Sequence, residues 1–435
     1  MSVANGVSLL GCVVLALLAW AIGGFRRPIP WRTVIGSAVL MLGMATLVFW
    51  VPPVRKVLVI VNAAVHSLLG ASREGALFLF GPLALNRGEM TPSGESSVGF
   101  VLAAQVLPAV IFFASLMALL YHLRVMPVLV RWIGRLFHKG MGLSGAESLA
   151  GASNVFVGIE SAAAVRPYLA TMTRSELLTL LACGMSTVAS TTLALYVFFL
   201  GEQFPQVAGH LLSASMLSIP AAAMMSKMML PETDEPATRG HVPEIPQEER
   251  RQTAMAALIA GAWDGLKLAA GIAVTLIAVL GVLALCNMAL AWISTPFAAA
   301  LGGPLSLERV LGWLFTPLAW LLGIESPDVA VSARLLGQRL VATEIVAFQE
   351  LGRLAAAGAV SPRSMVICSY ALCGFAHFAS VAIFVGGISA LAPERREDLA
   401  ALSFKALASA TLATLMTGAL AGVFYVGQAA VLGLP

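Results

Sequence analysis

The sequence predicts an all-α integral membrane protein with eight transmembrane helices, two re-entrant helical hairpins and interfacial helices. Three observations support this fold class. Of the 435 residues, 59% are hydrophobic and 11% are charged, whereas about a quarter of the residues in a typical soluble domain are charged. Eight apolar stretches are long enough to cross a bilayer of about 30 Å as helices. Two further segments with polar centres belong to an inverted internal repeat.

The eight spans are expected at residues 7–24, 33–51, 97–122, 177–201, 203–226, 268–294, 364–391 and 406–432. No basic residues precede the first apolar run, so we expect a retained span rather than a cleaved signal peptide. Residues 231–252 are polar and contain prolines, so we expect a mobile cytoplasmic linker there.

Lysine and arginine residues follow every second span, which places those connections in the cytoplasm by the positive-inside rule. Both termini are therefore expected on the outer side of the membrane. The basic residues that carry this assignment are Arg26, Arg27, Arg32, Arg124, Arg131, Arg135, Lys139, Arg239, Arg250, Arg251, Arg395 and Arg396.

Four apolar segments do not fit as spans. Residues 55–71 and 309–324 are short and flanked by charge or proline, which suits helices that lie in the membrane interface. Residues 142–172 and 328–356 are apolar at both ends and polar in the middle. A span would leave those polar groups in hydrocarbon at a few kcal/mol each. A re-entrant hairpin whose tip faces a polar cavity avoids this cost.

The two hairpins open the two units of the repeat, residues 151–190 and 335–380. Each unit holds a glutamate in its hairpin, then an Arg-Ser turn, then a helix with a shared pattern, CGMSTVAS at 183–190 and CGFAHFAS at 373–380. By the charge count the two helices leave opposite sides of the membrane, so the repeat is inverted. Inverted repeats with broken helices are typical of secondary transporters, whose solute site lies at mid-membrane between the repeats.

The two hairpin glutamates, Glu160 and Glu344, are candidate solute ligands, because intramembrane acids are costly and usually lie on a functional path. Each can accept hydrogen bonds from solute hydroxyls or carry a proton. The alternative is a structural role at the hairpin tips. His377, one helical turn from Ser380, either contacts the same solute or is an interior side chain satisfied by its neighbours.

A second set of residues offers neutral oxygens. Asn154 and Thr187 are close to hairpin carbonyls, notably that of Val157. Hard monovalent cations take such oxygens, and unwound backbone at a hairpin tip supplies them. The alternative for Asn154 is a helix cap.

Other function classes find little support. The net charge of +4 comes without a basic tract, which argues against nucleic acid as a partner. The five cysteines lie in apolar runs without a CxxC pair and are expected to be buried hydrophobic residues. No soluble catalytic motif is present, so we expect no enzyme. A membrane enzyme or a receptor-like gate is the competing class, but the two glutamates have no metal site or nucleophile beside them.

At these residues the sequence resembles the concentrative nucleoside transporters of the bacterial, sodium-coupled type. The segments that carry the resemblance are SNVFVG (153–158), ESAAAVRPYL (160–169), MSTVAS (185–190), GWLFTPLAWLLG (312–323), TEIVAF (343–348) and GFAHFAS (374–380). The resemblance implies a homotrimer in the bacterial inner membrane, with periplasmic termini and an elevator-type motion. It also implies five regions: scaffold spans one to three with an interfacial helix (1–122), a first transport repeat (123–230), the linker (231–252), scaffold span six with an interfacial helix (253–324) and a second transport repeat (325–435).

The resemblance also implies the ligands of both substrates. Sodium would be held by Asn154, Thr187 and the carbonyls of Val157 and Val188. The nucleoside would be held by Glu160, Glu344, His377 and Ser380, with Thr192 and Ile159 near the base.

Three positions depart from the family. The first hairpin reads Gly158-Ile159-Glu160, one residue shorter and without the family's base-reading glutamine. His377 replaces the asparagine that meets the ribose, and Thr343-Glu344 replaces an Asn-Glu pair. A site that lacks its amide cannot read a base edge in the same way. The alternatives are therefore a modified nucleoside or another polyol solute on the same carrier fold, or coupling to protons.

Overall fold

The chain is helical throughout the part that a computed structural model describes. The described residues are 3–86, 89–90, 94–243, 253–297, 303–425 and 427, without the side chains of Arg55, Ile159, Glu160 and Ala163. Within them the structure contains no β-strand, in agreement with the predicted all-α class. Eight helical stretches are long and apolar enough to cross a membrane.

Most predicted spans correspond to observed helices. Five of the spans correspond to single long helices: α1 (Val3–Ile22), α2 (Trp31–Trp50), α5 (Leu107–His122), α10 (Val207–Met229) and α11 (Ala254–Ser294). The span predicted at 177–201 is broken into α8 (Arg174–Ser186) and α9 (Ser190–Leu200), and the last becomes α18 (Arg396–Phe424). A short helix, α4 (Leu102–Gln105), precedes α5. Residues 426 and 428–432 of the last predicted span lie outside the described part.

One predicted interfacial segment and one predicted span need correction. The helix predicted at 55–71 extends from Pro52 to Phe80 as α3 and is itself long enough to be a candidate span. Lys56 and Arg73 interrupt the apolar pattern, but neither residue ends a helix. The span predicted at 364–391 is two helices, α16 (Pro362–Leu372) and α17 (Phe378–Leu391), which are each too short to cross the bilayer. The chain leaves the helical conformation at Cys373 and is extended at His377.

The helix α6 (Val125–Met141) was not predicted. Its buried residues are Met126, Val130, Ile133, Gly134, Phe137 and Met141. They recur every three or four positions, which is the spacing of one helical face. The basic residues on the other face lower the average hydrophobicity of the segment, which hides this pattern.

Each predicted hairpin is a pair of consecutive helices. The first comprises α7 (Gly145–Asn154) and the 3₁₀ segment η2 (Ile159–Thr171), and the second comprises α14 (Val329–Val341) and α15 (Glu344–Ala356). Serine and glutamate form a capping box at the start of α7, and threonine and glutamate form another at the start of α8. Such boxes satisfy free backbone N–H groups at a helix start, so both turns are encoded locally.

The beginning of the linker contradicts the expected mobility. The N–H groups of Gly145 and Ala146 donate to the carbonyl and hydroxyl oxygens of Thr238, both at 3.0 Å. Thr238 is buried. Residues 231–243 therefore pack on the start of α7, whereas residues 244–252 lie outside the described part.

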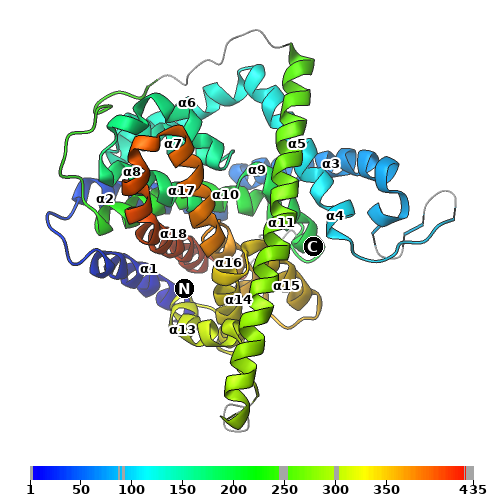
Figure 1. Ribbon diagram of the computed structural model, residues 1–435. Coiled ribbons are helices and arrows are strands. Elements are labelled where there is room, and N and C mark those ends of the chain that lie inside the picture. Colours follow the sequence, from blue (N-terminus) through cyan, green and yellow to red (C-terminus); the bar gives the residue numbers. More distant parts are fainter. Residues whose placement is uncertain are drawn as a thin grey trace.

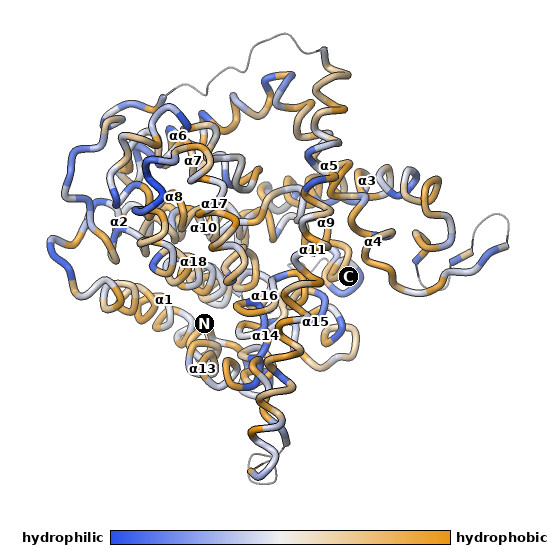
Figure 2. The backbone as a smooth tube through the Cα atoms, in the orientation of Figure 1, coloured by the Kyte–Doolittle hydropathy of each residue, from blue (hydrophilic) through white to orange (hydrophobic). Residues whose placement is uncertain are grey.

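The helices are arranged in two groups (Figure 1). The long helix α11 runs beside α5, with α3 and α4 next to α5, while α1, α2, α10 and α18 pack with the hairpins and the broken helices. Small residues permit the close approach of α11 to α5: a Cβ added to Gly265 would lie 2.7 Å from the Cα of Ile111. Figure 2 shows that hydrophobic residues predominate along α11 and α1. The helix α13 (Leu307–Leu321) matches the second predicted interfacial segment and packs on α14.

Candidate functional site

Glu344 is the centre of the candidate site. It is the first residue of α15, directly after the tip of the second hairpin, and is 1% exposed. The hydroxyl of Tyr196 donates a hydrogen bond of 3.0 Å to its Oε1. The Nε2 atom of His377 lies 3.0 Å from its Oε2, and Oε2 makes no hydrogen bond among the described residues. The hydroxyl of the neighbouring Thr343 is likewise buried and unpartnered.

The start of α17 fixes the ring of His377. This residue is the N-cap of the helix, and its Nδ1 accepts a hydrogen bond of 3.1 Å from the backbone N–H of Ser380. A nitrogen that accepts carries a lone pair, so the proton of the neutral imidazole is on Nε2, the atom that faces Glu344. The Ser380 hydroxyl donates to the carbonyl of His377 at 2.7 Å.

Aromatic residues form one wall beside Glu344. The ring of Tyr196 on α9 stacks on that of Phe348 on α15, with centroids 4.2 Å apart and an interplanar angle of 17°. Both side chains are fully buried. Thr192 lies one turn before Tyr196 on the same helix and is also buried. Stacked aromatic rings next to a carboxylate suit a ligand with both a flat apolar part and hydroxyl groups.

The tip of the first hairpin lies at the break between α8 and α9. The carbonyl of Phe156 accepts a hydrogen bond of 3.0 Å from the N–H of Ser190. Asn154, the last residue of α7, is fully buried; its Nδ2 donates to the carbonyl of Ala150, and its Oδ1 accepts from Ser161 at 2.9 Å. This arrangement brings Asn154 and Val157 to the broken helix.

The break itself supplies further oxygens. Thr187 is the C-cap of α8, and its hydroxyl donates to the carbonyl of Cys183 at 3.0 Å. The carbonyl of Val188 accepts only a long contact of 3.5 Å from Ser215. Each of these oxygens, like the Oδ1 of Asn154, keeps a lone pair for a further ligand. A set of neutral side-chain and carbonyl oxygens suits a hard monovalent cation.

The structure thus gathers some predicted residues and leaves others open. Glu344, His377 and Ser380 are in one buried group. The side chains of Glu160 and Ile159 lie outside the described part, so their roles remain predictions. Tyr196 and Phe348 were missed, although each follows a predicted residue of the same helix by four positions: Tyr196 follows Thr192, and Phe348 follows Glu344. Arg339 on α14 was missed as well, and its guanidinium is fully buried.

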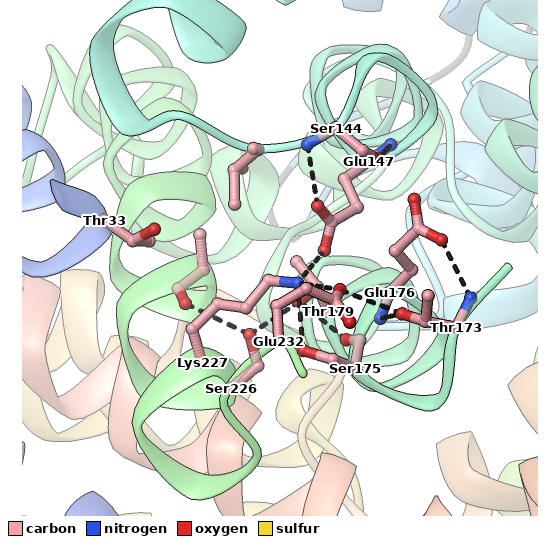
Figure 3. A network of polar contacts seen from close by, with 12 residues as sticks. Thr33, Ser144, Glu147, Thr173, Ser175, Glu176, Thr179, Ser226, Lys227 and Glu232 are labelled. Atoms are coloured by element: carbon pink, nitrogen blue, oxygen red, sulfur yellow. Dashed lines mark hydrogen bonds and ion pairs between the residues drawn. The ribbon is translucent and has the colours of Figure 1, made fainter. Parts of the chain in front are cut away.

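A second buried polar network lies at the base of the first hairpin (Figure 3). The ammonium group of Lys227, near the end of α10, is 2.6 Å from Glu147 of α7 and 3.1 Å from Glu232 of the linker. It also donates to the hydroxyl of Ser175 on α8 at 3.0 Å. Glu147 is 3% exposed and Lys227 4% exposed. One lysine therefore ties α7, α8, α10 and the linker together.

Models of protein families match the chain over most of its length. The model described as Na+ dependent nucleoside transporter C-terminus matches residues 210–422, and that of the N-terminus matches residues 10–83. A model described as nucleoside recognition matches residues 103–203.

Individual relatives span nearly the whole chain. The putative nucleoside permease NupX of Escherichia coli is 34% identical over 97% of this chain and 99% of that protein. Nucleoside permease NupC of Helicobacter pylori is 33% identical over 96% of this chain and 97% of that protein. The structure of CNTnw in an inward-facing substrate-bound state matches with a TM-score of 0.85 and 34% identity, over 96% of this chain and 98% of that one.

Proposed function

This chain belongs to the family of Na+-dependent nucleoside transporters, and from that premise we propose that it imports nucleosides by cotransport with sodium. The observation that carries the proposal is a pair of buried oxygens at the tip of the second hairpin, Thr343 Oγ1 and Glu344 Oε2. Neither makes a hydrogen bond among the described residues, although Oε2 lies 3.0 Å from His377 Nε2. Buried polar atoms are nearly always hydrogen-bonded in folded proteins, so such a pair indicates a ligand that completes it.

The solute would bind through its sugar. Glu344 accepts hydrogen bonds from ribose hydroxyls. Tyr196, which stacks on Phe348, holds the carboxylate of Glu344 in place. His377 and Ser380 contact the same face, and Glu160 reaches the sugar from the first hairpin. Thr192 and Ile159 lie near the base. Because Ile159 offers no amide, we expect weaker discrimination between purines and pyrimidines.

Sodium would bind at the break between α8 and α9. The ligands are Asn154, Thr187 and the carbonyls of Val157 and Val188. Their neutral oxygens leave the positive charge of the sodium ion uncompensated. The ion and a negatively charged side chain that binds the solute therefore stabilise each other across the site. This mutual stabilisation is the physical basis of coupling.

The architecture would follow the family. The two helix pairs are re-entrant hairpins of an inverted repeat, both termini are periplasmic, and three protomers assemble in the bacterial inner membrane. Spans one to three (1–122) and span six (253–324) form the scaffold. The repeats (123–230 and 325–435), joined through the linker (231–252), carry the solute across it in an elevator-type motion.

Uptake by proteoliposomes tests the proposal. We expect radiolabelled uridine to accumulate when sodium is high outside, and not when choline replaces sodium or when a proton gradient alone is imposed. Unlabelled adenosine and cytidine should compete with uridine. Accumulation that persists without sodium and collapses with a proton uncoupler would favour proton coupling. If no nucleoside competes, a modified nucleoside or another polyol replaces the proposed solute.

A further inference from the structure

Arg339 is a buried cation without an ion-pair partner in the described part of the chain. It lies in the last turn of α14 and is 0% exposed. Its Nη1 donates to the carbonyl of Ala371 at 2.6 Å and to the hydroxyl of Thr414 at 2.7 Å. Both partners are neutral, and Nε and Nη2 have no hydrogen-bond partner. A buried charge is costly unless an opposite charge compensates it, so the position needs a reason.

Glu344 is the acid placed to compensate this charge. It follows Arg339 by five residues, across the tip of the same hairpin. Arg339 bonds to Ala371, six residues before His377, and His377 lies 3.0 Å from Glu344. The charges of Arg339 and Glu344 interact electrostatically. The other polar or titratable groups next to Glu344 in the described residues are Tyr196, Cys373 and His377. His377 lies 3.0 Å from Glu344 through its Nε2, and its Nδ1 accepts a hydrogen bond from a backbone N–H. Among these groups, Arg339 is the one whose positive charge is permanent.

The two charges do not form a hydrogen-bonded pair. A guanidinium in direct contact would take both lone pairs of a carboxylate edge in a bidentate pair. Nη1 of Arg339 instead bonds to Ala371 and Thr414, and Oε2 of Glu344 makes no hydrogen bond among the described residues.

We propose that Arg339 is a positioning residue for solute binding: a fixed counter-cation that offsets the negative charge of Glu344 while leaving its oxygens free for the solute. The inference rests on the proposed function for its transport readout. It also has a readout that does not depend on transport, because two opposite buried charges stabilise the folded protein only together.

The first test is uptake of radiolabelled uridine by proteoliposomes with variants of Arg339. For Arg339→Met we expect KM to rise by at least about 10-fold, as for loss of a charged hydrogen-bond acceptor, with less effect on the maximal rate per folded protein. Arg339→Lys should bring KM back to within about 3-fold of wild type. The matched control is Arg334→Met, which removes an exposed arginine of the same helix and should leave KM unchanged. A wild-type KM in Arg339→Met would overturn the proposal.

The second test is thermal unfolding of the purified protein without solute. Arg339→Met and Glu344→Gln should each lower the unfolding midpoint, because each leaves one buried charge uncompensated. The double variant should unfold at a higher temperature than either single variant. Additive losses in the double variant would show that the two charges do not support each other, whatever the transported solute proves to be.

Discussion

At the scale of single residues, Glu344 combines full burial with unused hydrogen-bonding capacity. Tyr196 occupies one carboxylate oxygen, while the other faces His377 without a hydrogen bond. Burial makes any unmade hydrogen bond costly, and the same burial makes a ligand that supplies the bond bind more tightly. Glu344 therefore keeps hydrogen-bonding capacity that a ligand could use.

Glu344→Gln tests this arrangement, because the amide keeps the shape of the side chain and removes its charge. A lost hydrogen bond to a charged group is worth about 1.5–3 kcal/mol, which corresponds to roughly a 10- to 150-fold rise in the KM for nucleoside. The matched control is Glu350→Gln on the same helix, where the carboxylate pairs with the exposed Arg353. Uptake kinetics equal to wild type in Glu344→Gln would mean that the acid is structural.

Asn154→Ala tests the proposed sodium site. The change removes one neutral oxygen ligand, so the sodium concentration for half-maximal uptake should rise several-fold while the pH dependence of uptake stays the same. Asn62→Ala is the control, because Asn62 bonds to Pro205 and Ala208 away from the break. A variant of Asn154 with unchanged sodium dependence would limit this residue to its contacts with Ala150 and Ser161.

At the scale of elements, the sequence predicts a helix well where one property dominates it. The long apolar run of α11 and the polar centres of the two hairpins could be located from composition alone. The break between α16 and α17 could not, because the residues around His377 are as apolar as a continuous span. The helix α6 was missed for the opposite reason: its basic face lowers the average hydrophobicity of a segment whose other face is buried.

The contacts of Arg339 and Lys227 could not be predicted from the sequence either. Both are single basic residues inside apolar segments, and their partners come from distant parts of the chain, such as Thr414 for Arg339 and Glu147 for Lys227. The capping boxes at Ser144 and Thr173 were readable from their spacing. A pattern within four residues is encoded locally, whereas a pairing between helices depends on how they pack.

Lys227→Met tests the network at the base of the first hairpin. The variant leaves Glu147 buried without its cation, and removing one partner of a buried pair costs about 3–5 kcal/mol. We expect a clear drop in the thermal unfolding midpoint measured by tryptophan fluorescence, with partial recovery when Glu147→Gln is added. The control Lys267→Met breaks an exposed pair with Asp264, which is worth about 1 kcal/mol or less. Equal small drops in both variants would contradict a structural role for the network.

At the scale of the whole molecule, buried polar groups lie at both places where a helix is broken. The tip of each hairpin lies against a break: Phe156 bonds to Ser190 at the first, and Glu344 faces His377 at the second. Unwound backbone inside a membrane is tolerated only where protein or a polar cavity surrounds it. The helices α5 and α11, by contrast, carry no such break, and we expect them to form a fixed frame beside the binding unit.

The last prediction concerns that frame. At 1.5 Å per residue, the 41 residues of α11 span about 60 Å, and among the described residues the helix packs chiefly on α5. Its remaining face is apolar, with Ile277 77% and Trp292 81% exposed. Membrane helices associate by close packing of such faces, so we expect this face to join three protomers.

Native mass spectrometry of the protein released from lipid nanodiscs should therefore give the mass of three 45.3 kDa chains. The trimer should persist when the nanodiscs are diluted before release, because its interface is buried in the membrane. Gly265→Leu should weaken it, since a side chain there would push α11 away from Ile111 of α5 and distort the frame. A stable monomer with full uptake activity would show that lipid alone covers α11, and that each chain transports independently of any partner.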